Sequence, residues 1–168
     1  MKTIVIIYGS DGGNTQEVAE QIGAKLSDYS PLIKDVAQAS KEDFLNYDVL
    51  ILGTPTTGMG DLQGDWDYFL DTFKQLDLNG KIVALFGLGD CYGYSDTFVD
   101  GMGILYEVVA QKNCKIIGQT PIVGYEFDES RAVVDGKFVG LAIDQDNLSD
   151  LTEDKINNWT DELKKHLD

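Results

Sequence analysis

The sequence predicts an α/β protein with a doubly wound parallel sheet of five strands and helices on both of its faces. The apolar runs show no polar alternation, which is typical of parallel strands that are buried on both sides. Segments with helical spacing of apolar residues alternate with these runs along the chain. At 168 residues, of which 43% are hydrophobic, the chain is long enough to bury its own core. We therefore expect a single domain over residues 1–168.

The first half of the chain contains three predicted strands, over residues 3–8, 31–36 and 48–53. Between the first two strands, helical spacing over about 14–26 places Val18, Ala19, Ile22 and Leu26 on one face. A long loop over 54–64 leads into a second helix, which contains Trp66, Phe69, Leu70 and Phe73. We interpret Trp66 as a core residue of that helix.

The second half continues with a strand over 81–86, a loop over 87–94, a helix from about 96 to 111 and a strand from 115 to 118. The alternation then stops, because residues 121–137 show no helical period. Strand character resumes over 138–143. Thr152 can cap a final helix that carries Glu153 and Asp154 in its first turn.

The loop after the first strand, Ser10–Thr15, is a candidate anion site. In an open α/β sheet, ligands bind beyond the carboxyl ends of the strands. This loop combines two glycines, two hydroxyl residues and an asparagine just before a helix, so backbone N–H groups and the helix dipole could hold an anion without Lys or Arg. It matches neither GxxxxGK[ST] nor GxGxxG, which argues against a nucleoside triphosphatase and a dinucleotide fingerprint. A plain glycine turn is the alternative interpretation.

Two more loops follow strands at the same predicted edge, over 54–64 and 87–94. Their glycines would let the backbone approach a flat ligand closely, and Tyr92 or Tyr94 could stack on an aromatic ring. The alternative for Tyr94 is an ordinary packed tyrosine. We expect Cys91 to be partly exposed and to act as a small side chain rather than as a regulatory thiol.

The charge of the chain excludes several classes of partner. Its 13 basic and 29 acidic residues give a net charge of −16, which argues against binding to nucleic acid or to an anionic membrane. The acidity either steers the protein toward a basic partner or only keeps it soluble. With one histidine and two cysteines, the chain offers no zinc site and no histidine triad. The N-terminal apolar run is too short for a signal peptide or a membrane span, so we expect a cytoplasmic location.

Taken together, the three loops resemble those of the flavodoxin family, and of its long-chain class. Ser10-x-Gly-Gly-Asn14-Thr15 resembles the phosphate loop of that family. Thr54-Pro55-Thr56 with the glycine-rich stretch after it resembles the first flavin loop, and Gly89-Asp90 through Tyr94 the second. The segment 127–143 resembles the insertion that splits the last strand of long-chain members. The resemblance covers essentially the whole chain and implies the strand order 2-1-3-4-5.

The resemblance implies one non-covalent FMN and no catalytic residue. The phosphate would be held by Ser10, Asp11, Gly12, Gly13, Asn14 and Thr15. The flavin ring would lie between the other two loops, at Pro55, Thr56, Thr57, Gly58, Met59, Gly60, Gly87, Leu88, Gly89, Asp90, Tyr92 and Tyr94. Tyr94 matches the tyrosine that stacks on the flavin in this family. We expect the Asp11 carboxylate to point into water, because a carboxylate that faced the phosphate would repel it.

The chain departs from the family pattern at two positions. Gly12 stands where many members have a hydroxyl residue, so one hydrogen bond to the phosphate would be missing. Thr57 stands where many have a tryptophan, which should weaken stacking by about 1 kcal/mol. We expect Met59 to cover part of the resulting gap.

Acidic residues and Gly58 bear on the redox chemistry that the resemblance implies. Three stretches without any Lys or Arg, 55–73, 82–111 and 138–154, are rich in acids and are expected to border the flavin. Their charge would disfavour the anionic hydroquinone and give the semiquinone/hydroquinone couple a low potential. The Gly58–Met59 peptide matches the one whose carbonyl rotates to accept the N5 proton of the semiquinone, and glycine tolerates that rotation.

The resemblance therefore implies a low-potential one-electron carrier rather than an enzyme. It would be a cytoplasmic monomer that docks transiently to flavodoxin/ferredoxin-NADP reductase and to oxidoreductases such as a pyruvate-oxidising enzyme. A flavin-dependent NAD(P)H reductase of the same fold is one alternative, although the single Arg131 and the base-free loops argue against it. A receiver-type signalling domain is another, but the strand over 48–53 lacks the acidic phospho-acceptor at its end.

Overall fold

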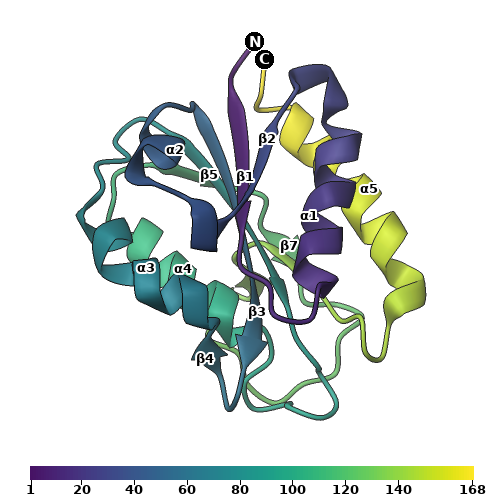
Figure 1. The fold of residues 1–168 in the computed structure, drawn as a ribbon. Helices are drawn as coiled ribbons and strands as arrows, with labels where there is room; N and C mark the ends of the chain where they lie inside the picture. Colours follow the sequence, from purple (N-terminus) through teal and green to yellow (C-terminus); the bar gives the residue numbers. More distant parts are fainter.

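The computed structural model describes residues 1–168 and is built on a central parallel sheet (Figure 1). The strand order is β10-β5-β3-β1-β2. These strands are β1 (Ile4–Tyr8), β2 (Leu32–Asp35), β3 (Val49–Thr57), β5 (Ile82–Leu88) and β10 (Leu141–Ile143). A further strand, β6 (Lys115–Ile117), pairs with the start of β5, whereas β10 pairs with its end. The predicted order 2-1-3-4-5, with a last strand that is split by an insertion, is confirmed.

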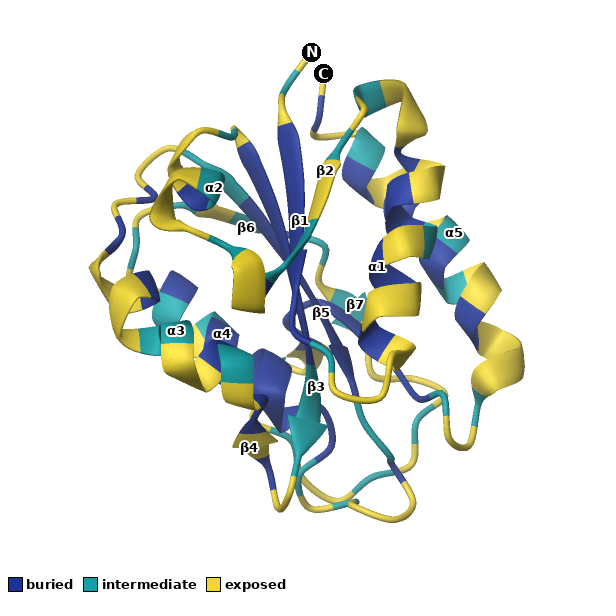
Figure 2. Ribbon diagram, viewed as in Figure 1, coloured by how far each residue is buried: buried dark blue, intermediate teal, exposed yellow.

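Helices cover both faces of the sheet, as predicted (Figure 1). One face is covered by α1 (Asn14–Lys25) and α5 (Thr152–Lys164), and the other by α2 (Lys41–Leu45), α3 (Gly64–Gln75) and α4 (Asp100–Val109). Successive side chains of a strand point to opposite faces, so Ile4 and Ile6 pack toward α1 and α5, whereas Val5 and Ile7 belong to the core on the other side. All four are at most 1% exposed, and Figure 2 shows β1 as part of the buried centre of the sheet, whereas the edge strand β2 is partly exposed.

The helix boundaries differ from the predicted ones in two places. The helix expected over 96–111 begins only at Asp100, because Val99 has the left-handed φ of 49° and residues 91–99 form turns. The short helix α2 is absent from the prediction, although Ser40 and Asp43 form a capping box at its start. Three 3-10 turns complete the helical segments, at Ser27–Tyr29, Val36–Gln38 and Ser149–Leu151. None of the helices is long and apolar enough to span a membrane.

The predicted loop over 54–64 is for the most part a β-hairpin. Strand β3 continues to Thr57 and returns as β4 (Asp61–Leu62), with Thr56 opposite Leu62. Gly58 and Gly60 have φ values of 52° and 94°, which suit glycine and allow the chain to turn back sharply. The edge of the cleft described below is therefore a paired ribbon rather than an irregular loop.

The insertion forms a small antiparallel sheet of its own, with β7 (Thr120–Pro121), β8 (Val133–Val134) and β9 (Lys137–Phe138). The run expected as one strand over 138–143 is divided, because Phe138 belongs to this sheet and Leu141 to the central one. Gly140 lies between them, so close to β5 that an added Cβ would stand 2.0 Å from the Leu85 carbonyl oxygen. The chain can therefore cross from one sheet to the other only at a residue without a side chain.

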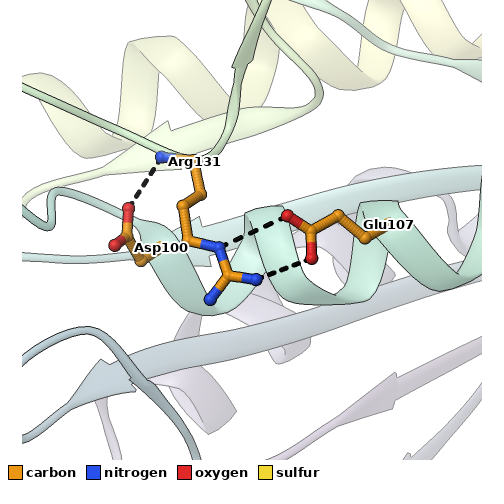
Figure 3. Close-up of polar contacts among 3 residues, drawn as sticks. All are labelled: Asp100, Glu107 and Arg131. Carbon is orange, nitrogen blue, oxygen red and sulfur yellow. Dashed lines mark hydrogen bonds and ion pairs between the residues drawn. The ribbon is translucent and has the colours of Figure 1, made fainter.

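Arg131 fastens the insertion to α4 (Figure 3). Its guanidinium donates to both carboxylate oxygens of Glu107, at 3.3 and 2.6 Å. Its backbone N–H donates to Asp100 Oδ1 at 2.8 Å, at the first turn of the same helix. Both contacts bind the insertion to α4, the helix that packs against β3 and β4.

Candidate functional site

A cleft of about 200 Å³ opens at the carboxyl ends of the central strands. These strand ends lie on the side of the molecule away from the two chain termini (Figure 1). Three of the segments that surround it follow β1, β5 and β10, and the fourth is the end of β3. Its lining consists of Ser10, Asp11, Gly12, Asn14, Thr15, Pro55, Thr57, Leu88, Gly89, Gln145 and Asp146. The structure thus brings residues from all three predicted loops to one place.

The loop between β1 and α1 presents free backbone donors to the cleft. The N–H groups of Asp11, Gly12, Asn14 and Thr15 make no hydrogen bond within the chain. Ser10 Oγ accepts from Gly13 N at 3.1 Å and keeps the loop closed, while Gly13 has the left-handed φ of 99°. An added Cβ at Gly12 or Gly13 would meet nothing within 4 Å, so the space above the loop is open. This arrangement suits a small anion at a helix N-terminus.

Asp11 departs from its predicted orientation. Asp11 is exposed, as expected, but its carboxylate also contacts the protein. Its Oδ1 accepts a hydrogen bond from Gln63 Nε2 at 3.0 Å. Gln63 is fully buried at the start of α3 and is not among the predicted site residues. The β1–α1 loop is therefore connected by a side-chain hydrogen bond to α3, the helix that follows the hairpin.

The hairpin places its predicted residues in four different environments. Pro55 and Thr57 line the cleft and are half-buried. Thr56 does not line it, because its hydroxyl accepts from Gly101 N of α4 at 3.0 Å. Gly58 and Met59 form the exposed tip, and Met59 is 86% exposed and outside the lining, so it does not cover the side of the cleft at Thr57. Gly60 is buried, with Asp100 Oδ2 and Thr97 each 3.0 Å from an added Cβ.

The loop after β5 carries two exposed tyrosines, and neither of them belongs to the lining of the cleft. Tyr92 and Tyr94 are 58% and 54% exposed, so Tyr94 is not an ordinary packed tyrosine. Asp90 organises the turn that carries them, since its Oδ1 accepts from Gly93 N at 2.7 Å and from Tyr92 N at 3.1 Å. Gly87 is buried against Met102, whose Cβ would lie 2.6 Å from an added Cβ.

The expectation that Cys91 is partly exposed is wrong. The residue is fully buried, and its backbone N–H donates to Asp144 Oδ2 at 3.0 Å. Burial, together with the Asp144 carboxylate beside it, raises the pKa of the Cys91 thiol to about 12. The backbone of Cys91 holds the loop in place while its side chain fills the core.

Gln145 and Asp146 line the cleft although the sequence analysis did not include them among the binding residues. They follow β10, whose carboxyl end reaches the same edge of the sheet as that of β5. The signal that could have found them was the position of the residues directly after the resumed strand. Partial desolvation and the nearby charges of Asp90 and Asp144 raise the pKa of Asp146, which is otherwise exposed.

The acidic stretches meet the cleft only in part. Asp90 and Asp144 lie close enough to Asp146 to raise its pKa, and Asp11 and Asp146 belong to the lining. Glu107 instead pairs with Arg131 on the outer side of α4 (Figure 3). The lining contains no Lys, Arg or His, so an anion in this cleft would be held by amides and hydroxyls alone.

Comparison with known proteins gives one consistent result. The family model described as "Flavodoxin" matches residues 6–159. A curated flavodoxin from Synechocystis is 46% identical over 168 residues, with 99% of each chain covered, and flavodoxin 1 of Escherichia coli is 40% identical over 163 residues, with 96% of this chain and 93% of the relative covered. Among solved structures, a Fusobacterium nucleatum flavodoxin that is bound to flavin mononucleotide superposes with a TM-score of 0.95 over all of both chains, at 34% identity.

Proposed function

The chain belongs to the flavodoxin family, and from this membership we propose that it is an FMN-dependent carrier that passes single electrons at low potential between partner proteins. We propose further that residues 1–168 act as one FMN-binding unit, a cytoplasmic monomer without substrate chemistry of its own. The observation that carries the proposal is the base-free cleft whose floor is a loop of unpaired backbone amides.

The β1–α1 loop fits the phosphate of FMN. Asp11, Gly12, Asn14 and Thr15 each offer a backbone N–H that lacks an acceptor within the chain. Thr15 is only 2% exposed, lines the cleft and has a hydroxyl without a protein partner. Phosphate esters bind well at such helix N-termini, since several N–H groups converge there and the helix dipole favours negative charge. The amides thus replace the counter-charge that the sequence does not supply.

We propose that the flat ring of FMN lies at the rim of the cleft. At about 200 Å³ the cleft is smaller than the roughly 300–1,000 Å³ of typical ligand pockets, so the remainder of FMN would extend over its edge. Thr57 and the Gly58–Met59 peptide on one side, and Tyr94 on the other, are the residues that we propose to hold the ring. When it is bound, FMN supplies two successive one-electron steps at one ring system.

The charges beside the cleft favour a low potential for the second of these steps. Asp146, although exposed, already has a raised pKa because partial desolvation and its acidic neighbours disfavour negative charge at that place. Negative charge that is added to the ring would meet the same environment, and no cationic side chain in the lining compensates it. We therefore expect the fully reduced form to be a strong reductant.

Transient docking to basic redox partners follows from the same charge. With a net charge of −16, the protein would attract partners that carry a positive patch, which accelerates encounter without requiring a large interface. We propose a flavodoxin/ferredoxin-NADP reductase as one partner and an oxidoreductase such as a pyruvate-oxidising enzyme as another.

Three measurements on the purified protein test the proposal. We expect yellow material, stoichiometric binding of FMN by the apoprotein, and two one-electron steps in an anaerobic photoreduction that is followed by absorbance. Colourless protein that does not bind FMN would contradict the proposal. Oxidation of NADPH by the protein alone, without an added reductase, would instead support the flavin-dependent reductase.

A further inference from the structure

The side chain of Gln63 makes four hydrogen bonds, and these connect the β1–α1 loop to the start of α3. Its Nε2 donates to Asp11 Oδ1 at 3.0 Å and to Asp65 Oδ2 at 2.7 Å. Its Oε1 accepts from Asp65 N and from Trp66 N, both at 3.1 Å. An amide group has two donors and two principal acceptor positions, so the hydrogen-bonding capacity of Gln63 is fully used.

These partners leave only one orientation of the amide. Carboxylate oxygens can only accept and backbone N–H groups can only donate, so Nε2 must face the two acids and Oε1 must face the helix. Gln63 is 0% exposed, which makes an unpaired amide there costly and holds the side chain in this position. A fully buried glutamine thus presents one fixed donor to the Asp11 carboxylate of the loop.

The backbone around Gln63 is shaped to allow this contact. At Gly9, just before the loop, an added Cβ would lie 2.3 Å from Gln63 Oε1 and 2.7 Å from Trp66 Cδ1. The carbonyl of Gly53 accepts from Gly9 N at 3.0 Å and from Trp66 Nε1 at 2.9 Å. The loop is therefore attached to α3 and β3 at two points, by its backbone at Gly9 and by its side chain at Asp11.

We propose that Gln63 is a positioning residue for recognition of the cofactor's phosphate, an inference that rests on the proposed binding of FMN. By binding the carboxylate of Asp11, Gln63 turns a negative charge toward α3 and away from the amides of the loop. The negative charge of Asp11 strengthens the hydrogen bond that its carboxylate accepts from Gln63. The same charge would repel a phosphate if the side chain were free to turn toward it. The contact thereby favours the phosphorylated flavin over one that lacks the phosphate.

Two substitutions of Asp11 separate the hydrogen bond from the charge. Asp11→Asn keeps an oxygen that can accept from Gln63 and removes the charge, whereas Asp11→Ala removes both. We expect Asp11→Asn to bind FMN at least as tightly as the wild type, and Asp11→Ala to bind it about fivefold more weakly than Asp11→Asn. Riboflavin lacks the phosphate, so its dissociation constants for the two variants should agree within about twofold.

The Gln63→Met background tests whether the difference in FMN affinity between Asp11→Asn and Asp11→Ala comes from the hydrogen bond to Gln63. In Gln63→Met the donor to Asp11 is absent, so the two Asp11 substitutions should have the same FMN dissociation constant. Asp67→Asn and Asp67→Ala form the matched control, because Asp67 is exposed on α3 and its carboxylate makes no hydrogen bond. These two variants should bind FMN equally.

The titrations use apoprotein, with quenching of flavin fluorescence as the signal, and urea unfolding of each apoprotein confirms that it is folded. Equal FMN affinities of Asp11→Asn and Asp11→Ala in the wild-type background would overturn the inference. A riboflavin affinity of Asp11→Ala that is reduced as much as its FMN affinity would also overturn it. If the wild type itself failed to bind FMN, the proposed function would fail. Normal FMN binding without the Asn/Ala difference would refute the role of Gln63 alone.

Discussion

At the scale of one residue, the conformation of Gly58 suits the rotation that we propose for the Gly58–Met59 peptide. Its φ of 52° is in the left-handed region, where a residue with a Cβ loses about 1 kcal/mol or more. An added Cβ would also lie 2.6 Å from Asp61 Oδ2 across the turn. Glycine removes both constraints and leaves the Gly58–Met59 peptide free to rotate toward the ring that we propose lies beside it.

Substitution of Gly58 should change the redox behaviour more than the fold. We expect Gly58→Ala to make the potential of the first electron more negative, so that the two one-electron potentials approach each other, and Gly58→Val to do so more strongly. Gly64→Ala is the control, since an added Cβ there meets nothing within 4 Å. Anaerobic redox titration measures both potentials, and an unchanged separation in Gly58→Ala would show that the peptide does not rotate as proposed.

Cys91 is a residue whose surroundings suppress the reactivity of its thiol. Its pKa of about 12 leaves almost no thiolate near neutral pH, and the side chain is fully buried. We expect the native Cys114→Ser variant, in which Cys91 is the only thiol, to react with Ellman's reagent at pH 8 only after denaturant is added. Rapid labelling of the native variant would contradict the burial of Cys91.

At the scale of elements, Asp144 joins the segments that follow β5 and β10. Its carboxylate accepts from the backbone N–H groups of Cys91, Asp146 and Asn147 and from the Asn147 side chain, at 2.8–3.0 Å. Burial alone would raise its pKa, but the hydrogen bonds from Asn147 and Cys91 prevail and lower it. Gly89 and Asp146, which line the cleft from two sides, are therefore held together by one buried charge.

Substitution of Asp144 should have an effect that depends on pH. A folded-state pKa below the ordinary 3.8 means that the carboxylate stabilises the fold above that pH and loses this contribution as the pH falls through the folded-state pKa. We expect Asp144→Asn to lower the free energy of unfolding by about 2 kcal/mol at pH 7. The difference from the wild type should shrink below about pH 4, as measured by urea unfolding of the two apoproteins. A difference that stays constant over this range would contradict the role of the charge.

At the scale of the whole molecule, charge is the dominant property. The net charge of −16 acts over distances set by ionic strength, because the screening length is about 10 Å at 0.1 M salt. Reduction of a basic c-type cytochrome by the reduced protein should therefore slow as salt increases, whereas reduction of a neutral small-molecule acceptor should not. Stopped-flow measurements at several salt concentrations test this, and equal salt dependence for both acceptors would show that the acidity does not steer docking.

The layers were predictable because their signals are local, whereas the strand order came from the resemblance to the flavodoxin family. Runs such as Ile4–Tyr8 are apolar on both faces and can lie only in the middle of a layered sheet, and α1 and α5 carry their apolar residues on one face. The predicted core position of Trp66 is confirmed, since it is fully buried. Boundaries were predicted less well where strand pairing decides them, as in the extension of β3, which pairs with β5 up to Pro55 and with β4 up to Thr57.

The candidate site was predictable to the extent that it follows from where strands end. The loop over 10–15 was identified because glycines and hydroxyl residues before a helix signal free amides, which the structure contains. Gln145 was missed because only its position after the resumed strand marks it, and that position reaches the cleft through the pairing of β10 with β5. Cys91 was misjudged because its neighbours in sequence are exposed tyrosines, whereas its burial arises from packing against the core and the insertion.

By itself, the sequence determined the class of fold, the position of the anion loop and the charge of the molecule, since period, composition and turn residues act over a few positions. The tertiary structure alone decided which polar groups are still free. Asp11 and Thr56 appear as equal candidates in the sequence, yet each makes a hydrogen bond to a residue 52 or 45 positions away. Such partners are set by the closure of the whole sheet, because a hydrogen bond forms only when folding brings its donor and acceptor within about 3 Å.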